Sequence, residues 1–137
     1  MATIYQLNDA QVQQLHGLYQ TAWWAKERTL EQARQCVQGS QIVIGLTDDA
    51  GNLIAFTRVV TDYTFKAFMF DVLVHESYQG KGLGNQLVNL VKNHPRLKDV
   101  THIELYCRPN LCDFYGQHGF TPNVGDITLM RLNIEDR

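Results

Sequence analysis

The stretch His75–Leu87, HESYQGKGLGNQL, decides how the rest of this sequence is interpreted. It lies between a strand-like apolar run and an apolar helical pattern. Every second residue in its centre is a glycine, and one lysine lies among them: Gly80, Lys81, Gly82, Gly84. Glycine accepts positive φ and has no side chain to block a ligand, so such a loop lets backbone N–H groups approach an anion. The following helix N-terminus adds unpaired N–H donors and a partial positive charge. The stretch therefore predicts a phosphate or pyrophosphate cradle, with a flexible connection as the plainer alternative.

Two phosphate-binding patterns with a defined spacing do not fit this loop. A P-loop requires Ser or Thr after its glycine–lysine pair, but Lys81 is followed by Gly82. A dinucleotide fingerprint requires a third glycine, and Asn85 occupies that position. The loop thus predicts a general anion site at a helix N-terminus, with the charge of Lys81 at its rim.

The composition is that of one globular domain, and we expect residues 1–137 to form it. Apolar residues make up 45% of the chain and charged residues 19%. The 12 basic and 14 acidic residues give a net charge of −2, with no run of Lys or Arg. This balance argues for neither nucleic acid nor membrane as a partner. We see no signal peptide and no apolar run of membrane length, so we expect a cytoplasmic protein.

Cysteines and histidines give no sign of a metal site. Cys36, Cys107 and Cys112 are too few for a disulfide framework. Neither their spacing nor that of the five histidines matches a zinc site, so no metal is expected. We expect the cysteines to pack as small apolar residues.

Periodicity and turn signals predict a mixed sheet with helices on both faces. Capping boxes at Asn8 with Gln11 and at Thr29 with Gln32 mark two helix starts. The expected elements, in order, are a strand at Thr3–Leu7, a helix after Asn8, a helix from Thr29 to about Gln38, strands at 41–49, 53–62 and 65–74, a helix from 83, a strand at 100–107, a short helix at 109–118 and a last strand at Ile127–Ile134. Strand 65–74 is apolar nearly throughout, as expected of a strand covered on both faces. The strand–helix–strand unit around the glycine loop predicts a parallel pair with a right-handed crossover.

Two stretches resemble motifs of the GCN5-related N-acetyltransferase (GNAT) family. In VLVHESYQGKGLGNQLV, the family's pattern of Gln or Arg, two residues, Gly, one residue, and Gly or Ala is matched by Gln79, Gly82 and Gly84. The stretch NLCDFYGQHGF is similar to the family's Asn…Phe-Tyr-x-x-x-Gly-Phe ending, matched by Asn110, Phe114, Tyr115, Gly119 and Phe120. The resemblance is close over residues 53–120. The two N-terminal helices agree in order and length only.

The resemblance implies a GNAT-like acyl-CoA N-acyltransferase fold of the α+β class. Such a fold has a central mixed, mostly antiparallel sheet, a splayed parallel strand pair and helices on both faces. Acetyl-CoA is the implied co-substrate, with its pyrophosphate in the glycine loop and its pantetheine between the strand Asp71–Val74 and the strand His102–Cys107. Asn110 would hold the pantetheine from the other side. The residues implied to bind the coenzyme are Val72, Leu73, Val74, Gln79, Gly80, Lys81, Gly82, Leu83, Gly84, Asn110, Phe114 and Tyr115.

The implied reaction transfers the acetyl group to a primary amine of a small molecule or peptide by direct attack on the thioester. Tyr115 resembles the family's general acid near the sulfur, and a backbone N–H around Leu73 would meet the oxyanion. Each of these side chains also has a structural interpretation. Tyr115 and Phe114 fit core aromatics, and Asn110 fits a helix N-cap.

The general base is less defined. An alkyl amine has a pKa of ~10.4 and is mostly protonated at neutral pH, so a base would help to form the nucleophile. Asp71 and Glu104 lie on the two splayed strands, and either could face the acceptor cleft. The plainer interpretation places an acidic strand residue at an edge or on the surface.

The amine pocket has four candidate residues. Trp23 and Trp24 lie between the two N-terminal helices, where the family tends to build its acceptor site. Core packing is the other common use of such large aromatics. Arg58 and Tyr63 are weaker candidates.

Two other classes of function stay open. One is a non-catalytic acyl-CoA-binding regulatory domain, which predicts binding without turnover. The other is a protein for a different phosphate ligand, such as a nucleotide. A homodimer is a further expectation from the resemblance, while the acceptor and the acyl chain are not selected by the sequence.

Overall fold

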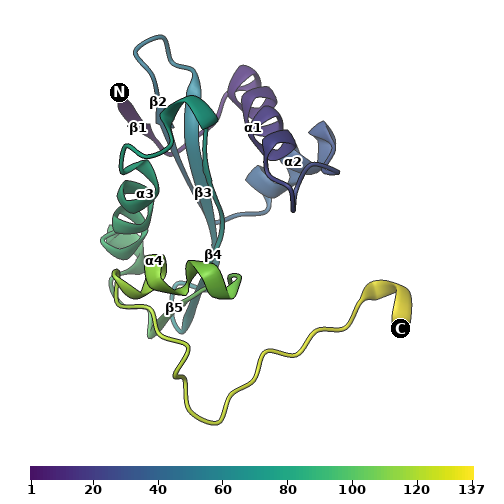
Figure 1. Ribbon diagram of the computed structural model, residues 1–137, viewed down its shortest axis with the longest axis vertical. Helices are drawn as coiled ribbons and strands as arrows, with labels where there is room; N and C mark the ends of the chain where they lie inside the picture. Colours follow the sequence, from purple (N-terminus) through teal and green to yellow (C-terminus); the bar gives the residue numbers. More distant parts are fainter. The chain divides into compact units, whose positions relative to one another are not determined.

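The computed structural model describes residues 1–137 and divides them into two compact units, Met1–Leu105 and Tyr106–Arg137. Figure 1 labels the elements of both units. The first contains β1 (Ala2–Ile4), α1 (Asp9–Thr21), α2 (Leu30–Gln38), β2 (Ile42–Thr47), β3 (Leu53–Thr61), β4 (Lys66–Val74), α3 (Leu83–Lys92) and β5 (His102–Glu104), with 3₁₀ turns at Glu76–Tyr78 and Pro95–Leu97. The second contains 3₁₀ turns at Pro109–Leu111 and Ile134–Asp136 and the helix α4 (Cys112–Gly116).

One five-stranded sheet organises the first unit. Its strand order is β1-β2-β3-β4-β5, and every neighbouring pair is antiparallel except β4 and β5, which are parallel. Figure 1 shows α1 and α2 on one side of the strands and α3 on the other. The predicted mixed sheet with a parallel pair joined by a helix and with helices on both faces is confirmed.

The N-terminal helices form because their sequences satisfy their own ends and bury one face. Both predicted capping boxes are present, at Asn8 with Gln11 and at Thr29 with Gln32. α1 buries an apolar stripe against the sheet. The core cluster formed there contains Leu15, Leu18 and Tyr19 of α1, Phe56 of β3 and Leu73 of β4. This cluster fixes α1 against the middle of β3 and the end of β4. None of the helices combines the length and apolar character needed to cross a bilayer.

Strand β4 is less covered than its apolar sequence predicts. Ala67, Met69 and Leu73 are buried, whereas Val72 and Val74 are only half-buried. The prediction of a strand covered on both faces was therefore wrong. Apolar residues on the second face remain within reach of a ligand.

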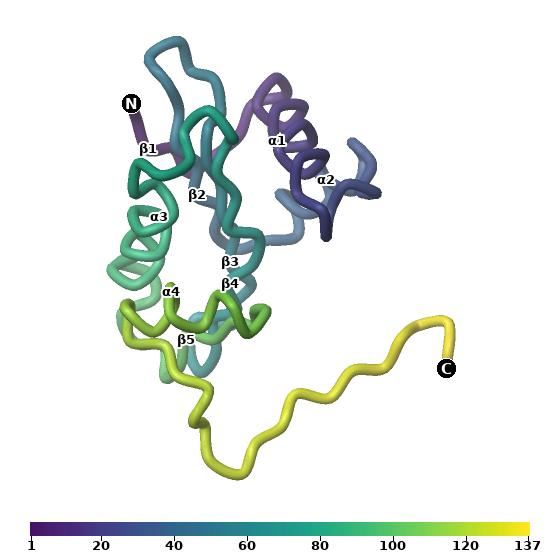
Figure 2. The backbone as a smooth tube through the Cα atoms, viewed as in Figure 1, coloured from purple at the N-terminus to yellow at the C-terminus, as the bar shows by residue number.

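The C-terminal segment differs most from the sequence-based expectation. The predicted strand Ile127–Ile134 is wrong, because the segment belongs to no sheet. Its apolar side chains are exposed, Met130 by 89%. Figure 2 shows the yellow end of the tube running as an extended chain within the second unit. The alternation of apolar and polar residues specifies a face for a strand, but it does not supply the partner whose hydrogen bonds make a strand. The predicted strands at Thr3–Leu7 and 100–107 are also shorter than expected.

Candidate functional site

The glycine loop joins the end of β4 to α3 through two residues with left-handed backbone. Gly80 has φ +77° and Gly82, the N-cap of α3, has φ +81°. A Cβ atom at either position would meet nothing within 4 Å, so the glycines serve the backbone conformation and not a close packing contact. No side chain caps the first turn of α3. The helix therefore begins with N–H donors that no side chain of the N-cap residue engages, as an anion site requires.

Two polar side chains flank this loop. Gln79 Nε2 donates to the carbonyl oxygen of Val74 at 3.2 Å, which ties the start of the loop to the end of β4. Lys81 is exposed, and its Nζ lies 5.2 Å from the centre of the Tyr78 ring. The left-handed conformation thus belongs to the loop backbone, while the exposed lysine adds a positive charge at the rim.

The ladder between β4 and β5 ends early. It pairs Lys66 with His102 and ends with Phe68 opposite Glu104, although β4 continues to Val74. The two strands therefore part in the region where the sequence predicts a splayed pair.

The hydrogen-bond phase of β4 decides which backbone groups face this opening. The N–H of His75 donates to the carbonyl of Ile54 on the β3 side at 2.8 Å. Backbone groups alternate between the two edges of a strand, so Leu73 faces β3 as well. Val72 and Val74 face the other edge, beyond the end of the β5 ladder. The oxyanion donor predicted near Leu73 is therefore better sought at its neighbours.

A β-bulge interrupts β4 just before these residues. Phe56 pairs with Leu73 but Arg58 pairs with Phe70, so Thr57 opposes both Asp71 and Val72. Asp71 has φ +61°, a left-handed conformation that residues other than glycine rarely adopt. The bulge turns the Asp71 side chain into the protein.

Asp71 is the centre of a buried hydrogen-bond cluster. Its side chain is 4% exposed, and Oδ2 accepts from Tyr19 Oη at 2.8 Å, Arg28 NH1 at 2.9 Å and Arg58 Nε at 2.7 Å. Burial opposes ionisation of this carboxyl, but the hydrogen bonds and charges of Arg58 and Arg28 outweigh it and lower the pKa of Asp71. A carboxylate so stabilised is a weak proton acceptor. The geometry therefore favours a positional role over that of a general base.

The cluster gathers residues from four parts of the first unit. Tyr19 comes from α1, Arg28 from the connection between α1 and α2, and Arg58 from β3. The Arg28 guanidinium also lies 4.6 Å from the centre of the Tyr19 ring and 5.2 Å from that of Trp24. Sequence reasoning missed Tyr19 and Arg28 as site residues. Tyr19 fits the apolar stripe of α1, and nothing in the sequence links Arg28 to a residue 43 positions away.

Glu104, the other candidate base, lies in the last residue pair of the β4–β5 ladder. Its Oε1 forms an ion pair with Lys66 Nζ at 2.7 Å, on a part-exposed surface. Glu104 faces Phe68, four residues before Val72, or about 13 Å along an extended strand. The structure does not bring Glu104 and Asp71 together.

Of the predicted pocket residues, Trp24 and Arg58 contact the Asp71 cluster, whereas Tyr63 lies elsewhere. Trp23 and Trp24 lie in the connection between α1 and α2, and Trp23 is 63% exposed, so it is not a core residue. Arg58 belongs to the Asp71 cluster. Tyr63 lies in the turn between β3 and β4, where its ring stacks under Arg96 at 4.3 Å, so it does not join the others.

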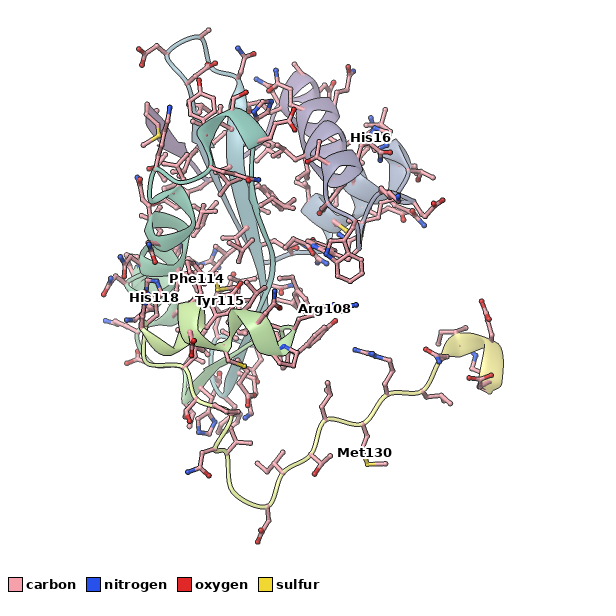
Figure 3. All side chains as sticks on the ribbon, in the orientation of Figure 1. His16, Arg108, Phe114, Tyr115, His118 and Met130 are labelled. Atoms are coloured by element: carbon pink, nitrogen blue, oxygen red, sulfur yellow. The ribbon has the colours of Figure 1, made fainter.

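The second unit carries the other predicted motif on α4. Tyr115 is buried, and its ring contacts Phe114 and Phe120 edge to face at 4.9 and 6.1 Å. Figure 3 labels Phe114 and Tyr115 on this helix and His118 just after its end. Burial, with a smaller contribution from Cys107, raises the pKa of Tyr115 to about 12. The tyrosine hydroxyl therefore stays protonated across the physiological range.

Asn110 and Gly119 frame that helix. Gly119 has φ +94° and follows the last turn, where the Phe120 N–H donates to the Tyr115 carbonyl at 3.2 Å. This is the C-terminal glycine that the sequence predicts. Asn110 lies in the preceding 3₁₀ turn and is exposed, and α4 has Leu111 as its N-cap. The alternative role of Asn110 as N-cap of this helix was wrong, so its amide is not committed to capping.

The chain has clear relatives among known proteins. Residues 4–120 match the Acetyltransferase (GNAT) family. An uncharacterized N-acetyltransferase, ycf52, of Porphyra purpurea is 30% identical over 78% of this chain and 63% of its own length. Serotonin N-acetyltransferase 2, chloroplastic, of Oryza sativa subsp. japonica is 34% identical over 68% of this chain and 48% of its own length. The chain thus spans about half to three fifths of these relatives.

The fold has a close counterpart among solved structures. A protein of Xanthomonas campestris pv. campestris, assigned to the GNAT family as an acetyltransferase, superposes with a TM-score of 0.80 at 26% identity. The match covers 98% of this chain and 94% of the other. Sequence motifs, sheet topology and these relatives agree: the chain belongs to the GNAT family of acetyltransferases.

Proposed function

We propose that this protein is an acetyl-CoA-dependent N-acetyltransferase acting on a primary amine of a small molecule or a peptide. The observation that carries the proposal is the end of β4. Its backbone at Val72 and Val74 faces an edge that β5 leaves, and it leads directly into a glycine loop with two left-handed residues and an α3 start that no side chain caps. The free edge of β4 suits the extended, amide-containing pantetheine arm of the coenzyme. The glycine loop and the start of α3 suit the pyrophosphate next to that arm.

The residues that would hold the coenzyme fit it in charge and in space. The absence of any atom within 4 Å of a Cβ at Gly80 or Gly82 leaves room in front of the loop backbone. Gln79 fixes the loop against Val74, and Lys81 adds a positive charge. We propose that one acetyltransferase domain comprises both compact units, because the family match runs from residue 4 to residue 120 and crosses from the first unit into the second. Asn110, Phe114 and Tyr115 carry the family's second motif within the second unit, and we propose them as coenzyme ligands on that ground.

When bound, acetyl-CoA supplies the activated acetyl group as a thioester. The chain's contribution to the thioester carbonyl is a backbone donor. Val72 is the first residue after Asp71, and its N–H faces the edge of β4 that β5 leaves, so we assign it as the donor to the carbonyl oxygen. Removing one such donor typically costs on the order of 10²–10³ in rate.

Tyr115 is proposed to protonate the leaving sulfur. A hydroxyl of pKa about 12 gives its proton to a thiolate of pKa ~8.5 only uphill, by about 5 kcal/mol. Its contribution would therefore come from holding a hydrogen bond to the sulfur and not from rapid complete transfer. We expect Tyr115→Phe to lower kcat with little change in the KM for acetyl-CoA.

The acceptor amine has no dedicated base among the candidate carboxylates. Asp71 is held ionised by two guanidinium groups, and Glu104 pairs with Lys66 some distance along the sheet. Forming the neutral amine at pH 7 from a group of pKa ~10.4 costs about 4–5 kcal/mol. Water or desolvation in the site would have to provide this step. The rice relative is named for serotonin, so an arylalkylamine is the first acceptor class that we propose to test.

The lack of a dedicated base among the candidate carboxylates also favours one alternative, a regulatory domain that binds acyl-CoA without turnover. Isothermal titration with acetyl-CoA, with ATP as the control ligand, tests the coenzyme site shared by both functions. Thiol release with serotonin, a lysine-containing peptide and a polyamine then separates them. Binding with amine-dependent turnover supports the acetyltransferase, and binding alone supports the regulatory domain. Absence of acetyl-CoA binding, or equal binding of ATP, would refute both.

A further inference from the structure

We infer that Asp71 is a positioning residue, whose buried ion cluster holds the β4 bulge so that the Val72 N–H points to the opening between β4 and β5. This inference rests on the proposed function for the identity of the ligand at that opening. It goes beyond it because it assigns a role to four side chains, Tyr19, Arg28, Arg58 and Asp71, none of which is a coenzyme ligand.

The link between Asp71 and Val72 is covalent and short. The N–H of Val72 belongs to the peptide plane between the two residues, so the φ and ψ angles of Asp71 set its direction. Asp71 has φ +61°, and only Thr57 opposes the two residues on β3. A strand without the bulge would continue the regular alternation and would turn the N–H of Val72 toward β3. The direction of this donor therefore depends on the left-handed conformation at Asp71.

Residue 71 is not a glycine, so its left-handed backbone conformation has to be stabilised by contacts of its side chain. Three donors reach the same oxygen, Oδ2, from α1, from the connection between α1 and α2, and from β3. They come from 52, 43 and 13 residues away, so the carboxylate is fixed from several directions at once. Thr57 adds a fourth bond at the bulge, from its Oγ1 to the carbonyl of Phe70 at 2.8 Å.

The negative charge of Asp71 holds the positive charges of Arg28 and Arg58 close together. Two guanidinium groups face one carboxylate, and their side chains are exposed by only 28% and 16%. A neutral residue at position 71 would leave two like charges close together in a poorly hydrated place. Repulsion would then separate Arg28 from Arg58 and release the bulge. The connection between α1 and α2, which carries Trp23 and Trp24, would loosen with it.

Two substitutions separate the charge of Asp71 from its backbone conformation. Asp71→Asn keeps the shape and tolerates positive φ, but removes the charge. Asp71→Gly makes positive φ easy and removes the side chain. Arg34→Gln is the matched control, because it breaks an arginine–carboxylate pair of 2.9 Å on the exposed face of α2.

The first readout is amide hydrogen exchange, which needs no acceptor. We expect exchange of the Leu73 and His75 amides, whose N–H groups face β3, to be about tenfold faster or more in Asp71→Asn than in wild type or Arg34→Gln, with the remaining strands unchanged. The second readout is thiol release with the panel amine that wild type acetylates. We expect kcat to fall about 100-fold in Asp71→Asn while the KM for acetyl-CoA stays within about threefold. Asp71→Glu should recover part of kcat.

The outcomes distinguish this inference from the proposed function. Absence of acetyl-CoA binding by the wild type overturns the proposed function, whereas the exchange measurement still decides whether the cluster holds the bulge. Unchanged exchange in a folded Asp71→Asn variant, wild-type kcat in Asp71→Gly, or a loss confined to KM would each overturn the inference. If Asp71→Asn does not fold, Arg28→Gln takes its place, because it removes the most exposed donor of the cluster and leaves the Arg58 pair intact.

Discussion

The glycine loop and the β4 bulge adopt left-handed backbone by opposite means. Gly80 and Gly82 have φ +77° and +81° because glycine permits it, and a side chain there would touch nothing. Asp71 has φ +61° because three donors hold its carboxylate. The loop is specified within a few residues of sequence, whereas the bulge is specified by the tertiary fold. Adjacent parts of one site thus differ in what would break them.

The largest effect is expected from breaking the bulge cluster with Asp71→Leu. This change leaves Arg28 and Arg58 without their counter-charge and places a bulky side chain at positive φ. We expect a loss of about 3–5 kcal/mol in the free energy of unfolding, measured by urea denaturation. Glu31→Leu is the control, since it breaks an exposed pair with Arg34 and should change stability by about 0.5 kcal/mol or less. Similar losses in the two variants would show that the Asp71 cluster is no more than a surface pair.

This contrast also explains which parts of the molecule could be predicted from sequence. The capping boxes, the glycine loop and Gly119 were predictable because each depends on residues within a few positions of one another. The Asp71 cluster was not, because its donors are up to 52 residues away and each has an ordinary alternative use. The sequence pointed to Asp71 as an acid in a strand, but its partners, which decide whether it acts as a base, appear only in the fold.

The C-terminal segment illustrates the opposite error. Its alternation of apolar residues is a strand pattern, yet Ile127, Leu129 and Leu132 remain exposed. Periodicity reports which side of a strand would be buried, and a strand also needs a neighbour with unused backbone groups. Local pattern was enough for the helices because their hydrogen bonds are internal.

A second prediction concerns the pH dependence of stability. Interactions with Arg58 and Arg28 lower the pKa of Asp71 in the folded state despite its burial. The stability that they contribute is complete above the unfolded-state pKa of ~3.9 and is lost as the pH falls through the lower folded-state pKa. Wild type should therefore lose stability below about pH 4 more steeply than Asp71→Asn in urea titrations at pH 7, 5, 4 and 3.

The difference between these two curves isolates Asp71. Asp48 and Asp62 also have lowered pKa values, from hydrogen bonds with Asn52 and with Thr64, but they titrate in both proteins. Arg34→Gln should follow the wild-type curve. Parallel curves for wild type and Asp71→Asn would show that the cluster does not stabilise the charged form.

A third prediction tests the left-handed backbone of the glycine loop. Gly82→Ala places a Cβ at φ +81°, where no atom obstructs it, so the cost is conformational and amounts to about 1–2 kcal/mol of stability. The acetyl-CoA affinity should fall as well, because the first turn of α3 relaxes. Gly17→Ala is the matched control. Gly17 lies inside α1 with nothing within 4 Å of a Cβ, and there the same substitution should stabilise by about 0.5–1 kcal/mol.

The smallest effect is expected at the lysine of the loop. Lys81 is exposed, with its Nζ 5.2 Å from the Tyr78 ring, so its attraction to a pyrophosphate is screened by water and salt. Lys81→Gln should weaken acetyl-CoA binding only about two- to fivefold in titration calorimetry, and the difference should shrink at high salt. Lys92→Gln, at the far end of α3, should have no effect. A loss of 100-fold or more at Lys81 would mean that a side chain, and not the left-handed backbone, holds the anion. The loop and the bulge would then resemble each other after all, since both would depend on charged side chains for their function.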